Sequence, residues 1–149
     1  MSSLDEIPVV SGAGAPASRE LPLNGALESV LHEVRHALAR LVGTGETTKI
    51  DLKSMPFGPG DLDRLIAFLG KGEVQASIEA LGPTRVQETA TAGVWLVDYL
   101  NSEAQRLALH LEIAHVPEIL RPQPQDLDDA IAALDARLNR VGGDPPPTS

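Results

Sequence analysis

The spacing of apolar residues changes at Gly72, and this change is the strongest constraint on the fold. Before this glycine most apolar residues recur with the helical period of about 3.6 residues, whereas from Gly72 to Pro117 they alternate with polar residues, as in strands. After Pro117 the helical period returns. We therefore predict an α+β fold, in which an antiparallel β-meander of about three to four strands packs with about three helices.

The strand region divides at its turn residues. Alternation over residues 74–79 predicts a first strand, and Gly82-Pro83 predicts the turn that ends it. Residues 84–101 fit either two strands or one long strand bent at Gly93. The bent strand is favoured because a glycine inside a strand pattern is typical of a bulge or kink. A further strand over residues 107–113 alternates cleanly.

Three segments have the pattern of amphipathic helices. The first runs from Asn24, a candidate N-cap, to Val42, and the second follows Asp61. A short strand around Ile50 separates them. The C-terminal helix has the clearest pattern, with one apolar face made by Leu127, Ala130, Ile131, Leu134, Leu138 and Val141.

The length of 149 residues suits one domain, which we place at residues 23–142. Residues 1–22 are rich in Ser, Gly, Ala and Pro, and residues 143–149 read Gly-Asp-Pro-Pro-Pro-Thr-Ser. Such segments bury too little apolar surface to offset the entropy lost on ordering, so we expect both to be disordered.

Charge and composition exclude several classes of function. Twelve basic against 21 acidic residues give a net charge of −9, which disfavours nucleic acid and anionic membrane surfaces as partners. The chain has no cysteine, which excludes disulfides, thiol catalysis and cysteine-bound metal centres. No signal peptide or membrane-spanning run is recognisable, so we expect a cytoplasmic protein. We expect no cofactor.

His32-Glu33-Val34-Arg35-His36 matches the zinc-protease motif H-E-x-x-H on a predicted helix. In that chemistry the two imidazoles bind zinc and the glutamate acts as general base. Here His32 and His36 fall on the helix side opposite the apolar face, and no third ligand stands out. A zinc-dependent hydrolase is therefore the alternative function, and a solvated helix face is the preferred interpretation.

Four segments of the chain resemble one known family. They are residues 69–74 (Leu-Gly-Lys-Gly-Glu-Val), 86–90 (Val-Gln-Glu-Thr-Ala), 92–95 (Ala-Gly-Val-Trp) and 112–119 (Glu-Ile-Ala-His-Val-Pro-Glu-Ile). This pattern is similar to the hydrogenase expression/formation proteins of the HupH type, and the resemblance covers about residues 48–120. Family members are about twice as long, with a second related domain after the first.

The resemblance implies an accessory, chaperone-like assembly protein for a nickel–iron uptake hydrogenase rather than an enzyme. Its implied partner is the hydrogenase small subunit or another maturation protein. A homodimer is a further expectation, because a half-length relative could rebuild the two-domain pair by self-association.

The candidate partner-binding residues are Gln87, Glu88, Thr89 and Glu112. A Gln-Glu-Thr run is a poor core former, and Glu88 falls on the same side of its strand as Val86. A carboxylate placed there must be paired, hydrogen-bonded or exposed in a groove. Partner binding is the preferred role for these residues, and no catalytic residue is predicted.

Overall fold

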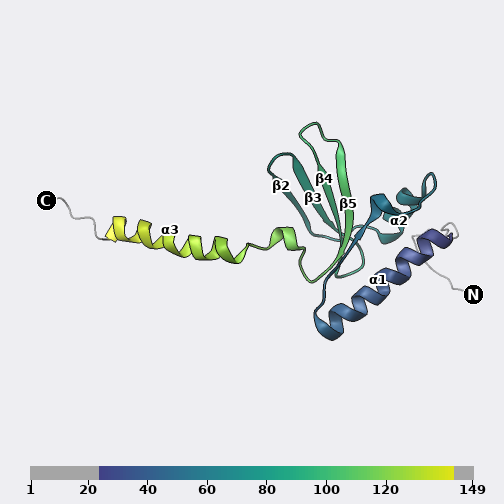
Figure 1. The fold of residues 1–149 in the computed structure, drawn as a ribbon, viewed down its shortest axis with the longest axis horizontal. Coiled ribbons are helices and arrows are strands. Elements are labelled where there is room, and N and C mark those ends of the chain that lie inside the picture. The colour runs from purple at the N-terminus through teal and green to yellow at the C-terminus, as the bar shows by residue number, and fades with distance from the viewer. Residues whose placement is uncertain (1–23, 143–149) are drawn as a thin grey trace, which may run out of the picture.

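The protein's structure, a computed structural model, describes residues 24–142 (Figure 1). The disordered segments expected at 1–22 and 143–149 lie outside the described residues. No helix within the described range is long and apolar enough to cross a membrane.

Five antiparallel strands form one sheet in the order β1-β5-β4-β3-β2. The strands β2 (Gln75–Glu79), β3 (Pro83–Glu88), β4 (Val94–Leu100) and β5 (Arg106–Ile113) follow one another as a meander, and β1 (Thr48–Asp51) pairs with the outer side of β5. The predicted α+β class and antiparallel meander are confirmed. The sheet has five strands, slightly more than predicted.

The interpretation of residues 84–101 as one bent strand is wrong. β3 and β4 are separate antiparallel strands joined by a tight turn. Gly93 has a φ of +83°, a left-handed conformation that glycine adopts without a steric penalty. The hydroxyl of Thr89 holds the turn, because it accepts a bond from the Thr91 backbone N–H (3.1 Å) and donates to the Val94 carbonyl (2.8 Å).

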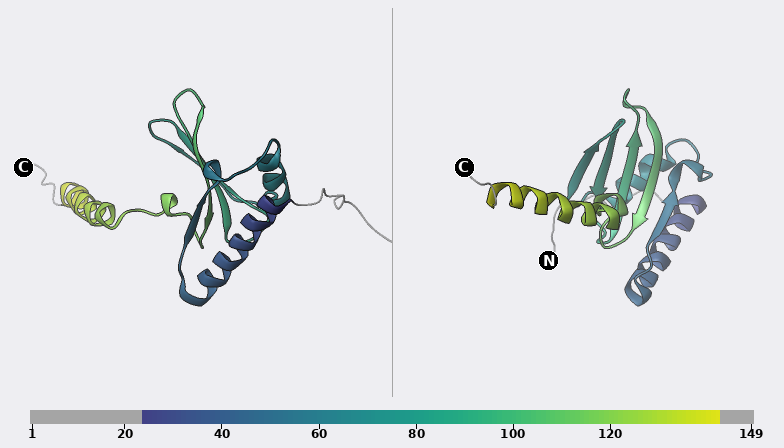
Figure 2. Two further views of the ribbon diagram at one scale, coloured as in Figure 1. Left: turned by 45° about the vertical axis from the view of Figure 1, so that its right-hand side comes forward. Right: turned by 60° about the vertical axis from the view of Figure 1, so that its left-hand side comes forward.

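Two helices, α1 (Gly25–Thr44) and α2 (Asp61–Leu69), pack on one face of the sheet (Figure 2). The amide of Leu27 donates to the Asn24 side chain at 3.0 Å, which confirms the predicted N-cap. The main core lies beneath these helices, and its buried residues are Leu27, Val30, Val34, Ala37, Leu41, Ile50, Leu52, Leu65, Leu69, Val94, Leu109, Leu111 and Ile113.

The third helix, α3 (Pro124–Gly142), projects away from the sheet (Figure 1). The predicted helix is confirmed, but it does not pack on the meander as expected, because every residue from 121 to 142 is exposed. A short 3-10 turn, η3 (Glu118–Leu120), and an arm containing Pro122 connect it to β5. Proline fixes φ and keeps the preceding residue extended, so this arm directs α3 outward.

The sheet face turned away from α1 and α2 is called the distal face here. A small second core lies on it, where Val86, Trp95 and Val97 are buried beneath Leu120 of η3. Strand register places further distal-face residues beside this core: Lys49, Ala76, Tyr99, His110, Glu88 and Glu112.

Candidate partner-binding site

The four segments that carry the family resemblance meet at one end of the sheet, which we call the motif end (residues 69–74, 86–95 and 112–119). The backbone of Gly72 donates to the Glu88 carbonyl at 2.7 Å, and that of Ala90 donates to Leu69 at 2.9 Å. The indole Nε1 of Trp95 donates to the Ala114 carbonyl at 3.0 Å. Segments far apart in the sequence therefore form one connected structure.

Glu88 fixes the loop that follows α2. Its Oε1 accepts bonds from the backbone amides of Glu73 (3.0 Å) and Val74 (3.2 Å). No larger residue fits at Gly72, where a Cβ would lie 2.5 Å from Glu88 Oε1 and 2.6 Å from the backbone carbonyl oxygen of Thr89. The half-buried carboxylate is thus hydrogen-bonded within the fold, one of the environments that its strand position required.

Gln87 and Thr89 also bond within the motif end. The amide Nε2 of Gln87 donates to the Glu88 carbonyl at 2.8 Å, and the Thr89 side chain is buried in the β3–β4 turn. Gln87 lies on the opposite sheet face from Glu88, since neighbouring strand residues point to opposite sides. These residues hold the loops of the motif end in place, and their own side chains offer a partner little surface.

Glu112 is the most buried of the four predicted site residues, with 2% of its surface exposed. Its Oε2 accepts a bond from the Glu118 backbone amide at 2.8 Å, which ties β5 to η3. Lys49, which pairs with Glu112 in register, donates from Nζ to Glu118 Oε1 at 3.1 Å. The register runs Lys49, Glu112, Trp95 and Glu88 across four strands, so the two predicted glutamates flank the tryptophan.

The charged cluster of Lys49, Glu112 and Glu118 raises or opposes the pKa shifts of two groups, Lys49 itself and Tyr99. The hydrogen bond to Glu118 raises the pKa of the Lys49 ammonium, and the charge of Glu112 acts in the same direction against a lowering by burial. Burial raises the pKa of the Tyr99 phenol; Lys49 opposes this increase, and the two glutamates add to it. Protonated forms are favoured at both positions.

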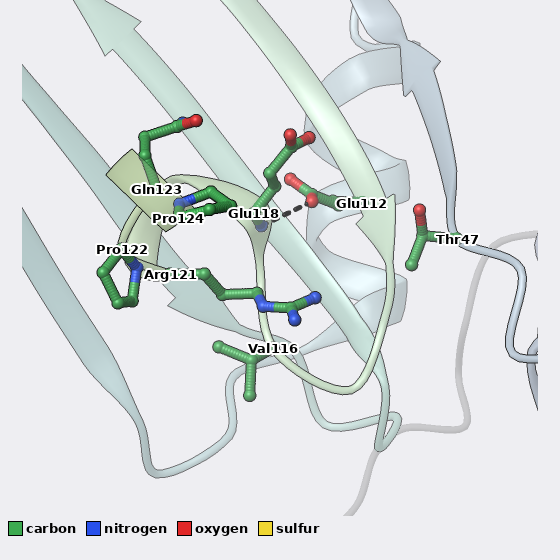
Figure 3. A pocket seen from close by; sticks show the side chains of 8 residues that line it. All are labelled: Thr47, Glu112, Val116, Glu118, Arg121, Pro122, Gln123 and Pro124. Atoms are coloured by element: carbon green, nitrogen blue, oxygen red, sulfur yellow. Dashed lines mark hydrogen bonds between the residues drawn. The ribbon is translucent and has the colours of Figure 1, made fainter. Parts of the chain in front are cut away.

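A polar pocket of about 360 Å³ opens beside Glu112 (Figure 3). Its walls come from the end of β5, η3 and the arm to α3, and its lining residues are Thr47, Glu112, Val116, Glu118, Arg121, Pro122, Gln123 and Pro124. The pocket offers two carboxylates and one guanidinium, groups suited to polar contacts with a protein segment. Among residues 24–142, no group of three or more His, Cys, Asp or Glu is placed to hold a metal ion.

The exposed surface of the motif end comes from residues that the sequence did not single out as binding residues. Lys71, Glu73 and His115 are exposed, and the apolar side chains of Val116 and Ile119 are 47% and 36% exposed. Alternation could not identify these residues, because they lie in connections rather than in strands.

The histidines of the H-E-x-x-H segment lie elsewhere. His32 and His36 are exposed on α1, whose buried face, centred on Val34, packs against the opposite side of the sheet from Glu112. Their position agrees with the solvated helix face preferred from the sequence.

Comparisons with known proteins point to one family. Residues 25–141 match the family described as HupH hydrogenase expression protein, C-terminal conserved region. The chain is 32% identical over 123 residues to the hydrogenase expression/formation protein HoxQ of Azotobacter vinelandii, covering 80% of this chain and 43% of that protein. It is 30% identical over 113 residues to HupH of Rhodobacter capsulatus, covering 76% and 41%.

A solved structure gives the same result. The hydrogenase expression protein HupH from Thiobacillus denitrificans aligns with a TM-score of 0.72 and 37% identity, covering 77% of this chain and 96% of that one. The chain spans less than half the length of the two curated relatives.

Proposed function

Because the chain belongs to the family of HupH hydrogenase expression proteins, we propose that it is a non-enzymatic accessory factor in the maturation of a nickel–iron hydrogenase. The family match over residues 25–141 carries this proposal, since it includes every helix and strand of the structure. Its client in this proposal is the hydrogenase small subunit, and it acts in the cytoplasm.

The proposed client-binding surface is the motif end. Gln87, Glu88, Thr89 and Glu112 hold its loops through internal hydrogen bonds. The contacts themselves come from the exposed neighbours of these residues, above all Val116, which lines the pocket and has 47% of its surface exposed. An exposed apolar side chain beside polar groups has the composition expected of a transient protein interface.

The test is capture of the small subunit from cells that make an uptake hydrogenase. The tagged protein should recover the small subunit or its precursor, and Val116→Asp should reduce recovery at least about tenfold, because it places a charge where an apolar contact is desolvated. Hydrogenase activity of a strain that carries only the variant gene should fall in parallel.

The matched control is Leu81→Asp. Leu81 is 95% exposed in the β2–β3 turn, at the opposite end of the sheet from the β3–β4 turn, and receives the same change in charge. It should leave recovery unchanged. If the wild-type protein captures no hydrogenase component, the proposed function is wrong; if both variants lose recovery equally, the motif end is the wrong surface.

A further inference from the structure

The apolar stripe of α3 has no cover in the described part of the chain. All five of its large side chains are more than half exposed: Leu127 (52%), Ile131 (62%), Leu134 (54%), Leu138 (59%) and Val141 (81%). Most of the stability of a helix in a protein comes from packing its apolar face against another surface rather than from helix propensity. The stripe therefore needs a partner surface.

The width of the stripe indicates another helix as that partner. In α1, which packs on a sheet, Val30 and Ala37 widen the apolar face and both are buried. The corresponding places in α3, three residues after Leu127 and Leu134, are taken by Ala130 and Arg137. Apart from the small side chain of Ala130, the apolar residues of this face have alternating spacings of four and three residues, the narrow seam of a coiled coil.

We propose that α3 pairs with α3 of a second copy as a parallel, two-stranded coiled coil. Ile131 and Leu138 then occupy the a positions, and the d positions are Leu127, Leu134 and Val141. Isoleucine at a with leucine at d is the combination that favours two parallel strands. This pairing is independent of the proposed client-binding function.

The flanking charges set the orientation. The first two e positions are aspartates, Asp128 and Asp135, and the third is the terminal Gly142. An antiparallel pair brings e positions of the two helices together, acid against acid. In a parallel pair, Asp135 faces Ala130 of the second copy, so no like charges meet. The charge pattern therefore selects the parallel arrangement.

The geometry allows this contact and limits its strength. α3 stands clear of the sheet in Figure 1 and in the left view of Figure 2, and every residue from 121 to 142 is exposed, so two copies can align these helices while their sheets point apart. At roughly 80 Å² for each apolar side chain, the pair buries on the order of 800 Å², which is less than a stable specific complex needs. We expect a concentration-dependent dimer with a micromolar or weaker dissociation constant.

Engineered cysteines test the arrangement directly, because the natural chain has none. In a parallel pair each d residue faces the same residue of the second copy. Leu127→Cys and Val141→Cys, at opposite ends of α3, should therefore each form disulfide-linked dimers rapidly under mild oxidation. The control is Ala136→Cys, which lies on the side of α3 away from the seam and should cross-link far more slowly. Cross-linking only in a mixture of Leu127→Cys with Val141→Cys would mean an antiparallel pair and overturn the proposal.

Sedimentation of the cysteine-free protein gives a second measurement. The wild-type mass should rise with concentration from 15.8 kDa towards twice that value. Leu134→Asp should weaken the dimer at least about 100-fold, since both copies lose a central apolar layer, while Ala136→Asp should change it little. Either of two results would exclude the coiled coil. One is a wild-type protein that stays monomeric at millimolar concentration, and the other is an equal weakening of the dimer in Leu134→Asp and Ala136→Asp.

Discussion

Glu88 and Trp95 face each other in the register of β3 and β4, but they contribute to the fold in different ways. Trp95 fills the small distal core, with 7% of its surface exposed and its indole N–H bonded to Ala114. Glu88 contributes one carboxylate oxygen to two amides of a neighbouring loop. Substitutions at the two positions should therefore have different effects on the free energy of unfolding.

Trp95→Ala should lower the free energy of unfolding by about 3–5 kcal/mol, because it removes a large buried side chain and leaves a cavity. Trp95→Phe keeps most of the apolar surface and loses the hydrogen bond to Ala114, so its cost should be about 1–2 kcal/mol. Chemical denaturation followed by circular dichroism measures both. Equal stability of Trp95→Ala and wild type would mean that the distal core contributes nothing.

Glu88→Gln should cost about 1 kcal/mol or less, because an amide oxygen can still accept from the loop amides but without the added strength of a charge. Glu88→Ala removes the acceptor and should cost about 1–2 kcal/mol, since water can reach this half-buried position. The same denaturation measurement compares them. A Glu88→Gln variant as unstable as Trp95→Ala would make the carboxylate an essential part of the core.

Alternation along the strands was enough to predict which residues share a face, but it could not predict their hydrogen-bond partners. Trp95 and Val97 share one face of the sheet and both are buried there, as the two-residue period of a strand predicts. The amides bound by Glu88 lie 14 and 15 residues earlier in the sequence. Such contacts depend on how α2 enters β2, which no local pattern specifies.

At the scale of elements, the missed turn between β3 and β4 has a specific cause. Residues 89–93 contain none of the Asn-Gly, Asp-Gly or proline pairs that indicate a hairpin turn. The turn is held by the Thr89 hydroxyl, a weaker and less recognisable turn former. The sequence pattern indicates a special backbone position at Gly93, and its positive φ serves a turn and not a bulge.

For α3 the sequence pattern predicts the helix but not where it packs. Its period of 3.6 residues predicted a helix, which the structure confirms, but periodicity alone does not specify the surface that covers the apolar side. Pro122 in the arm and Pro124 at the first position of α3 were the available indication that the helix leaves the sheet.

Removing α3 should leave the stability of the sheet domain unchanged. No residue from 121 to 142 is buried, so a chain ending at Gln123 loses no core contact. At a concentration where the full-length protein is monomeric, the free energies of unfolding should agree within about 0.5 kcal/mol. A larger loss would mean that α3 packs on the domain in solution.

At the scale of the whole molecule, the two proposed contact surfaces, the motif end and the apolar stripe of α3, are connected through η3 and the arm. The motif end includes η3, and the arm to α3 leaves directly from it past the pocket (Figure 3). Pairing through α3 would therefore bring two motif ends into the same assembly. Glu118 connects these features, because its backbone bonds Glu112 and its carboxylate bonds Lys49.

Lys49 and Tyr99, beside Glu112 and Glu118, make the stability of the fold decrease at alkaline pH. The pKa values of Tyr99 and Lys49 are both raised in the folded protein, by burial and by the Glu118 hydrogen bond respectively. A raised folded-state pKa means that the folded state holds its proton more tightly than the unfolded state does. This stabilisation is complete below about pH 10 and is lost as pH rises through the folded-state values.

Tyr99 is the only tyrosine, so the ultraviolet absorbance of its phenolate reports its titration directly. The midpoint in the folded protein should lie above that in denaturant, and Tyr99→Phe should reduce the fall in melting temperature between pH 9 and 11, because it removes one of the two linked protons. The remaining fall belongs to Lys49 together with general alkaline unfolding, and Lys49→Met separates these two contributions. Identical phenolate midpoints in the folded and denatured protein would show that Tyr99 is not shielded as the distal face requires.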